Sequence, residues 1–105
     1  MNTVHEVALE IFQPEPRVLY PLDMISRVLG VSRHTIMLYC KHGLISPTDS
    51  CELEGWYFPA DAIRQIRRAE MLRRTCGANL DAIRIILDLQ DEVASLQREL
   101  TFWRD

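Results

Sequence analysis

Four consecutive polar residues carry the side chains whose types and spacing could recognise an anion. Arg33 has the planar donor fork that pairs bidentately with guanine, and Thr35 could contact a base or a phosphate. Ser32 and the unpaired backbone amides at the start of a helix could hold a phosphate. His34 lies in the same turn, and Lys41 follows where it could flank a sugar-phosphate backbone. The cluster predicts nucleic-acid contact through the first turn of a helix, with a solvated helix face as the alternative.

Two short helices joined by a tight turn are predicted to position this cluster. The first follows Pro21, which suits the first helical position, and ends at Leu29 with Gly30 as a C-cap. Ser32 is a strong N-cap for the second helix, which Gly43 ends. Apolar residues recur at helical spacing on the inner faces: Met24, Ile25, Val28 and Leu29, then Ile36, Tyr39 and Cys40. Such a pair is typical of a helix-turn-helix.

Short strands are predicted on both sides of the helix pair. Alternating Val7, Leu9 and Ile11 predict one that ends at Phe12. Residues 55–58 predict another, as part of a hairpin, or wing, directly after the second helix. Because side chains alternate along a strand, Trp56 and Phe58 are expected to cover the core and Tyr57 to be the exposed member. The alternative for this aromatic triplet is stacking on bases.

Two further helices complete the expected chain. Pro59 and Asp61 open a third helix, and Asn79 caps a fourth that runs nearly to the end. The fourth helix carries a seam of apolar residues with heptad spacing: Ile86, Leu89, Val93, Leu96, Leu100 and Trp103. We expect this seam to form a coiled coil with a second copy of the chain, giving a homodimer. The alternative is that the helix folds back on its own domain.

Length and composition exclude several classes of protein. A chain of 105 residues is expected to form one domain, with a lead-in at 1–19, a winged helix-turn-helix at 20–78 and the seam-bearing helix at 79–105. No apolar run is long enough for a membrane span, and no signal segment is apparent, so we expect a cytoplasmic protein. The cysteines and histidines lack metal-ligand spacing, and no catalytic constellation is present. We therefore expect no metal, no cofactor and no enzymatic activity.

The net charge of −3 hides an uneven distribution of charge along the chain. One basic block spans residues 17–47, where Asp23 is the only acid, and another spans residues 60–78, where Arg67 and Arg68 add basic surface. Acidic blocks lie between and beyond these two. Such blocks can attract an anionic partner to part of a surface although the mean charge is negative.

The segment from Leu22 to Pro47 resembles the recognition segment of the MerR family of winged helix-turn-helix proteins. The similarity lies in Gly30-Val31-Ser32, Thr35-Ile36, Tyr39 and Gly43-Leu44-Ile45-Ser46-Pro47, and it continues in residues 79–87. Two subgroups are most similar, the HspR heat-shock repressors and the CbpM chaperone modulators. The resemblance covers roughly residues 20–100. It implies a mainly α fold and a dimeric transcriptional regulator of promoter DNA that responds to a protein contact. The implied contacts to double-stranded DNA are Ser32, Arg33, His34, Thr35, Tyr39, Lys41 and Tyr57.

Two departures from the family pattern favour an alternative function. DNA-reading members have an arginine and a tyrosine where this chain has Met37 and Leu38. The wing is preceded by acids at positions 49, 52 and 54, which would repel phosphates. The alternative is a CbpM-like modulator that binds a J-domain co-chaperone and no DNA. J-domains present a basic helix, so the acidic blocks at 49–54 and 81–99 would be the docking surface.

Overall fold

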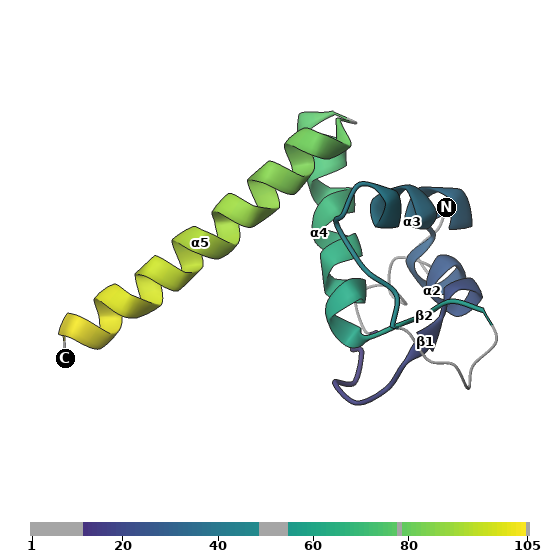
Figure 1. Ribbon diagram of the computed structural model, residues 1–105, viewed down its shortest axis with the longest axis horizontal. Helices are drawn as coiled ribbons and strands as arrows, with labels where there is room; N and C mark the ends of the chain where they lie inside the picture. The colour runs from purple at the N-terminus through teal and green to yellow at the C-terminus, as the bar shows by residue number, and fades with distance from the viewer. Residues whose placement is uncertain (1–11, 49–54, 78, 105) are drawn as a thin grey trace. The chain divides into compact units, whose positions relative to one another are not determined.

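The computed structural model describes residues 12–48, 55–77 and 79–104, which form four helices and one two-stranded sheet (Figure 1). The elements in chain order are β1 (Tyr20–Pro21), α2 (Leu22–Leu29), α3 (Arg33–Lys41), β2 (Tyr57–Phe58), α4 (Ala60–Cys76) and α5 (Leu80–Arg104). The mainly α class with a helix-turn-helix and a long C-terminal helix is confirmed. The predicted strand residues Val7, Leu9 and Ile11 lie outside the described residues.

The turn between α2 and α3 is built from the local signals that the sequence carries. Gly30 ends α2 at a φ of 67°, in the left-handed region that a residue without a Cβ adopts at low cost. The hydroxyl of Ser32 caps α3 by accepting a hydrogen bond from the amide of Thr35 at 3.1 Å. Pro21 differs from the prediction, because it takes the N-cap position of α2 at a ψ of 149° rather than the first helical position.

The small sheet differs from the predicted hairpin in its partner. β2 pairs antiparallel with β1, with Tyr20 opposite Phe58 and Pro21 opposite Tyr57. The carbonyl of Trp56 also accepts a hydrogen bond from the amide of Leu22 at 3.0 Å. The strand after the helix pair is therefore held by the segment that precedes the helix pair. This arrangement fixes the entry of α2 beside β2 (Figure 1).

The described residues divide into two compact units, one that ends at Arg67 and one that begins at Arg68. This division falls within α4, whereas the boundary expected from the sequence falls in the break between α4 and α5. Apolar side chains from α2, α3, β2 and α4 form the core of the first unit. Its most deeply buried large members are Ile25, Ile36, Tyr39, Phe58, Ile63 and Ile66.

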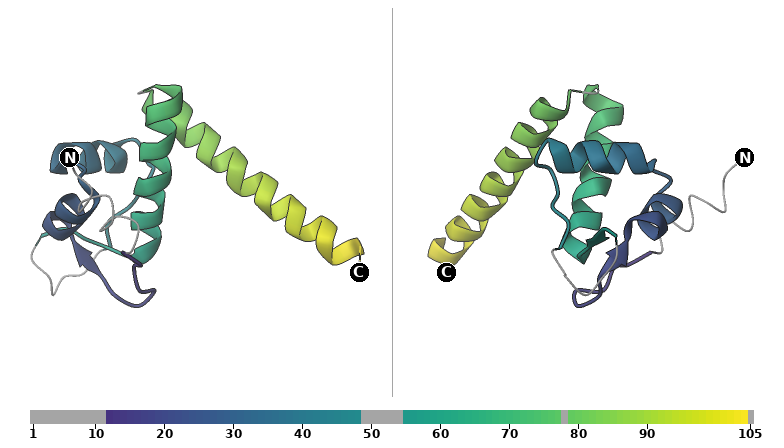
Figure 2. Two further views of the ribbon diagram at one scale, coloured as in Figure 1. Left: turned by 180° about the vertical axis from the view of Figure 1, so that it is seen from behind. Right: turned by 45° about the vertical axis from the view of Figure 1, so that its right-hand side comes forward.

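The second unit contains the end of α4 and the whole of α5. Asn79 caps α5, since its side-chain carbonyl oxygen accepts a hydrogen bond from the amide of Ala82 at 3.1 Å. Arg68 ties the end of α4 to α5 through Asp91 at 3.0 Å and Gln90 at 3.1 Å. Figure 2 shows α5 as one uninterrupted helix. Among the described residues, no helix combines the length and apolar character that crossing a membrane requires.

Candidate nucleic-acid interface

The first turn of α3 presents its polar groups where the sequence predicts them. The Ser32 hydroxyl is already occupied, because it caps the amide of Thr35 and lies 2.8 Å from the Thr35 hydroxyl. The amides of Arg33 and His34 precede the first intrahelical hydrogen bond, so they can donate to an anion. Phosphate binding at this helix end would therefore depend on backbone amides, with Ser32 fixing their direction.

The outer face of α3 carries a row of exposed side chains that spans the helix. Arg33, Met37 and Lys41 recur every four residues and are exposed, and His34 beside them is exposed as well. Ile36 on the opposite face is fully buried. The core therefore holds one face of α3 and leaves the other available, with cationic ends and an apolar middle.

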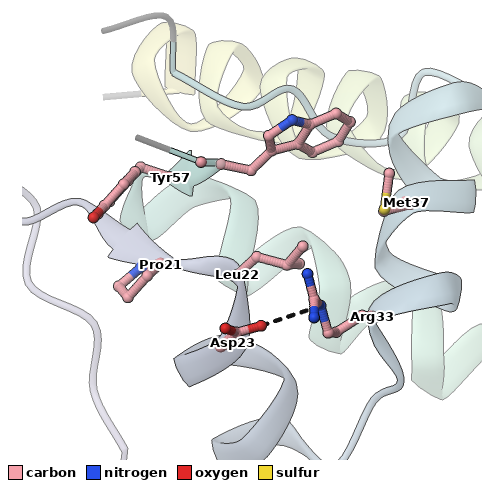
Figure 3. A pocket seen from close by; sticks show the side chains of 8 residues that line it. Pro21, Leu22, Asp23, Arg33, Met37 and Tyr57 are labelled. Carbon is pink, nitrogen blue, oxygen red and sulfur yellow. Dashed lines mark ion pairs between the residues drawn. The ribbon is translucent and has the colours of Figure 1, made fainter. Parts of the chain in front are cut away.

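Two of the predicted contact residues occupy different environments from the rest. Tyr39 has an exposed fraction of 0%, so its side chain belongs to the core and cannot touch a ligand without unfolding α3. The predicted DNA contact at Tyr39 is therefore corrected to a packing role. Tyr57 is half-buried in β2, and its side chain points away from Arg33 (Figure 3). Tyr57 therefore lies outside the α3 row.

An exposed acid lies directly beside the arginine of the candidate site. The Nε atom of Arg33 is 3.1 Å from a carboxylate oxygen of Asp23, a residue of the first turn of α2 (Figure 3). Both side chains are mostly solvent-accessible, at 65% and 73%. They lie at a hollow of about 340 Å³ whose wall includes Leu22, Met37 and Trp56. Arg33 is therefore present at the surface as an ion pair.

An apolar hollow continues along α3 beyond this ion pair. Its volume is about 520 Å³, and it is lined by His34, Met37, Leu38, Cys40, Lys41 and Trp56. Trp56 is 41% exposed, whereas Phe58 is fully buried and its ring lies 6.3 Å from that of Trp56. The prediction for Phe58 is confirmed. The prediction that Trp56 is covered and Tyr57 is the exposed aromatic is wrong, because β2 begins only at Tyr57 and Trp56 precedes the ladder.

The thiol of Cys40 lies at the edge of this hollow and is half-buried. Burial raises the pKa of the Cys40 thiol, because removal from water disfavours the thiolate, and a backbone hydrogen bond opposes this effect. The side chain therefore behaves as a small neutral residue of the helix face at neutral pH.

The arginines of the second basic block are largely engaged within the chain. Arg67 donates to the carbonyl of Phe12 at 2.6 Å, and its guanidinium carbon lies 5.4 Å from the centre of the Phe12 ring. Burial, together with the charge of Arg64, lowers the pKa of Arg67. Ion pairs join Arg64 to Asp61 at 2.7 Å, Arg68 to Asp91 at 3.0 Å and Arg73 to Glu70 at 3.5 Å. The predicted basic surface at Arg67 and Arg68 is therefore corrected to structural contacts.

The seam of α5 is solvent-exposed in the single chain. Val93 and Leu96 are each 52% exposed, Leu89 is 54% and Leu100 is 64% exposed. Trp103 is 79% exposed, and Ile86 is half-buried. A shallow hollow of about 310 Å³ lies along the first half of the seam. These side chains form a continuous apolar stripe that no other described segment covers.

Sequence reasoning missed Asp23 as a part of the candidate site, and it favoured the core over base stacking for Trp56. Asp23 counts in the sequence only as the single acid of a basic block, and no periodicity links it to Arg33 across a turn. The alternation of side chains predicts that Trp56 faces the core. Only the pairing of β1 with β2, which begins at Tyr57, shows that Trp56 lies outside the ladder. The place of both residues in the candidate site is therefore set by tertiary contacts, which the sequence pattern does not show.

An N-capped α3 packed on α2, followed by a strand and two longer helices, defines a helix-turn-helix protein. Residues 20–104 match the family described as MerR HTH family regulatory protein, so the chain belongs to this family. It is also 30% identical over 83 residues to a Streptomyces coelicolor protein that carries the name heat shock protein HspR. That alignment covers 79% of this chain and 54% of the relative, so the chain spans about half the relative's length. The predicted resemblance to the MerR family and to its HspR subgroup is confirmed.

Proposed function

We propose that this chain is a transcriptional regulator that binds double-stranded promoter DNA as a homodimer in the cytoplasm. The observation that carries the proposal is the outer face of α3. The core fixes Ile36 and Tyr39 on one side, so the other side presents Arg33, His34 and Lys41 to solvent. In helix-turn-helix complexes the corresponding helix enters the major groove at its N-terminal end. Membership of a family of regulatory proteins supports the same function.

Each group of the site has a distinct role in this proposal. Arg33 reads a guanine through its terminal nitrogens, and the amides at the start of α3 bind a phosphate. Thr35, which is half-exposed, and His34 contact the neighbouring base or phosphate. Lys41 and Tyr57 contact the sugar-phosphate backbone on either side. Since phosphate contacts carry no sequence information, specificity rests mainly on Arg33 and its neighbours.

The exposed seam of α5 supports the dimer. An apolar heptad stripe is unfavourable to leave in water, and a second copy offers the same stripe to cover it. Two copies of α3 would then read half-sites about one helical turn apart. The name of the Streptomyces relative extends the proposal to promoters of heat-shock genes, with a protein contact or another subunit as the input.

A fluorescence anisotropy titration tests DNA binding. The purified protein is titrated into duplexes carrying its own promoter, a heat-shock promoter from the same genome, and random sequence, at low and physiological salt. We expect the promoter to bind more tightly than random sequence. Arg33→Ala should weaken promoter binding about 5- to 150-fold, because a bidentate base contact contributes ~1–3 kcal/mol. Arg98→Ala removes the same charge from the exposed surface of α5 and is the matched control. Absent binding even at low salt would refute the proposal.

A second function is supported by the apolar hollow beside α3. Met37 and Trp56 are each 41% exposed there, and apolar side chains of this size are typical of protein-docking surfaces. As a CbpM-like module, the chain would bind a J-domain co-chaperone and no DNA, through this hollow rather than through the acidic blocks at 49–54 and 81–99. Co-purification with a J-domain protein from the same genome tests this function. Met37→Glu should abolish capture, and Met71→Glu, the same substitution at a residue of α4 that is 68% exposed and outside the hollow, is the matched control. Retained capture by Met37→Glu would exclude this face of α3 as the docking surface.

A further inference from the structure

Asp23 is an unexpected neighbour for a residue that approaches DNA. Its carboxylate is 73% exposed and lies 3.1 Å from Arg33, beside the helix end that would face phosphates. A carboxylate at this position repels the DNA backbone and reduces the release of counterions on binding. An ion pair between two exposed side chains contributes little to folding stability. An acid in the first turn of α2 favours that helix, but this does not require it to face Arg33.

The atoms joined by the ion pair indicate what the contact achieves. The carboxylate of Asp23 faces Nε, the nitrogen nearest the aliphatic stem of the Arg33 guanidinium. Guanine presents two acceptors in the major groove, O6 and N7, which match two parallel N–H donors. With Nε directed at Asp23, the two terminal Nη atoms form the edge that can meet these acceptors end-on. Among the described residues, Arg33 forms no ion pair with a second acid, so that edge is available to a base.

The small sheet fixes the backbone that carries the partner of Arg33. Figure 3 shows the Arg33 guanidinium lying between Asp23 and Leu22, which both belong to α2 and are placed by the β1–β2 pairing just before it. Leu22 is buried, and its amide is held by the carbonyl of Trp56 at 3.0 Å. Leu22 therefore anchors the backbone next to Asp23 in the core, while the Asp23 side chain itself is exposed. An arginine side chain has many rotamers, and holding it in one orientation before binding lowers the entropy lost in the complex.

We propose that Asp23 is a positioning residue that orients Arg33 for guanine recognition. This inference rests on the proposed DNA-binding function. Asp23 then lowers the general affinity for DNA through its charge, and it raises the discrimination in favour of sites with guanine at the Arg33 position. The two effects have opposite signs, so a substitution separates them.

The test uses a duplex selected by the wild-type protein from a pool of random sequences, with each G·C pair changed in turn to A·T. Asp23→Asn removes the charge and keeps the size of the side chain. We expect it to reduce discrimination between the selected duplex and one of the A·T variants about twofold to tenfold, the cost of immobilising one side chain. Its affinity for random-sequence duplex should be unchanged or higher. Asp61→Asn is the matched control, because Asp61 forms an exposed ion pair with Arg64 at 2.7 Å, also in the first turn of a helix.

A double-mutant comparison completes the test. In an Arg33→Ala background, Asp23→Asn should no longer change discrimination, because the residue that it positions is gone. Equal gains for selected and random duplexes in Asp23→Asn would overturn the inference and leave Asp23 as a charge that opposes DNA. An unchanged discrimination would also overturn it. If the wild-type protein selects no duplex at all, the proposed DNA-binding function fails, and the positioning role fails with it.

Discussion

Replacing Leu96 with aspartate should separate the proposed dimer into monomers. Leu96 lies in the middle of the exposed seam of α5, with Val93 and Leu100 one helical turn away on either side. In a coiled coil this residue inserts between side chains of the partner helix. In the proposed coiled coil, an aspartate there places a carboxylate from each copy in the apolar interface.

The expected size of the effect follows from the exposure of Leu96. Complete burial of a leucine side chain contributes ~1.5–3 kcal/mol. Because 52% of Leu96 is still exposed in the single chain, dimer formation can bury about half of that. Burial of Leu96 in both copies then contributes ~1.5–3 kcal/mol to the free energy of dimerisation. This corresponds to about a tenfold to hundredfold change in the dissociation constant of the dimer. Desolvation of two carboxylates adds several kcal/mol, so this range is a lower bound.

Sedimentation equilibrium over a wide range of protein concentration measures the dissociation constant directly. Ser95→Asp is the matched control, because it adds the same carboxylate to the neighbouring exposed position outside the seam. Circular dichroism of both variants checks that α5 stays helical, which is expected because Leu96 is half-exposed in the single chain. A Leu96→Asp protein with the wild-type dissociation constant would show that the seam is not the dimer interface.

Two further predictions concern α3 itself. Ser32→Ala should lower the free energy of unfolding by ~0.5–2 kcal/mol in urea denaturation, because the Thr35 amide loses its acceptor. Ser32→Asn should restore most of it, and an alanine variant as stable as wild type would contradict the capping role. The second prediction follows from burial, which raises the pKa of the Cys40 thiol. With Cys51 and Cys76 replaced by serine, alkylation of the folded chain should reach its pH midpoint above that of the urea-unfolded chain. Because the pKa of the Cys40 thiol is higher in the folded chain than in the unfolded chain, protonated Cys40 favours the folded state. This contribution to the free energy of unfolding is complete below the unfolded pKa and is lost as the pH rises through the folded pKa. Equal pH midpoints for the folded and unfolded chains would show that burial does not raise the pKa of the Cys40 thiol.

The features that the sequence predicts correctly are those set by neighbouring residues. Gly30 and Ser32 end and begin helices through their own backbone freedom and hydroxyl group, so their positions can be read directly. Asn79 caps α5 in the same way. Heptad spacing likewise places the apolar residues of α5 on one face. These signals need no knowledge of the rest of the fold.

The features that the sequence misses are set by residues far apart in the chain. The partner of β2 is Tyr20–Pro21, and a ladder of two residues is too short to leave a periodic pattern. Helical spacing places Tyr39 on the inner face, yet the family resemblance makes it a DNA contact, and its complete burial decides in favour of the core. Arg67 counts as basic surface until Phe12 is known to lie beneath it. In each case the side chain's role depends on its tertiary partner.

The distribution of paired arginines connects the fold to the way in which the chain would bind DNA. Sequence counting gives two basic blocks, but much of the second forms contacts within the chain through Arg64, Arg67, Arg68 and Arg73. The affinity of a DNA-binding protein for any sequence rises with the number of phosphates that its cations neutralise. A single copy with few available cations near α3 is therefore expected to bind random DNA weakly.

Two copies joined through α5 would bind as a unit, because the second α3 meets its half-site at a high effective concentration. The exposed seam and the modest charge of α3 thus favour the same conclusion, that dimerisation supplies affinity and Arg33 supplies selectivity.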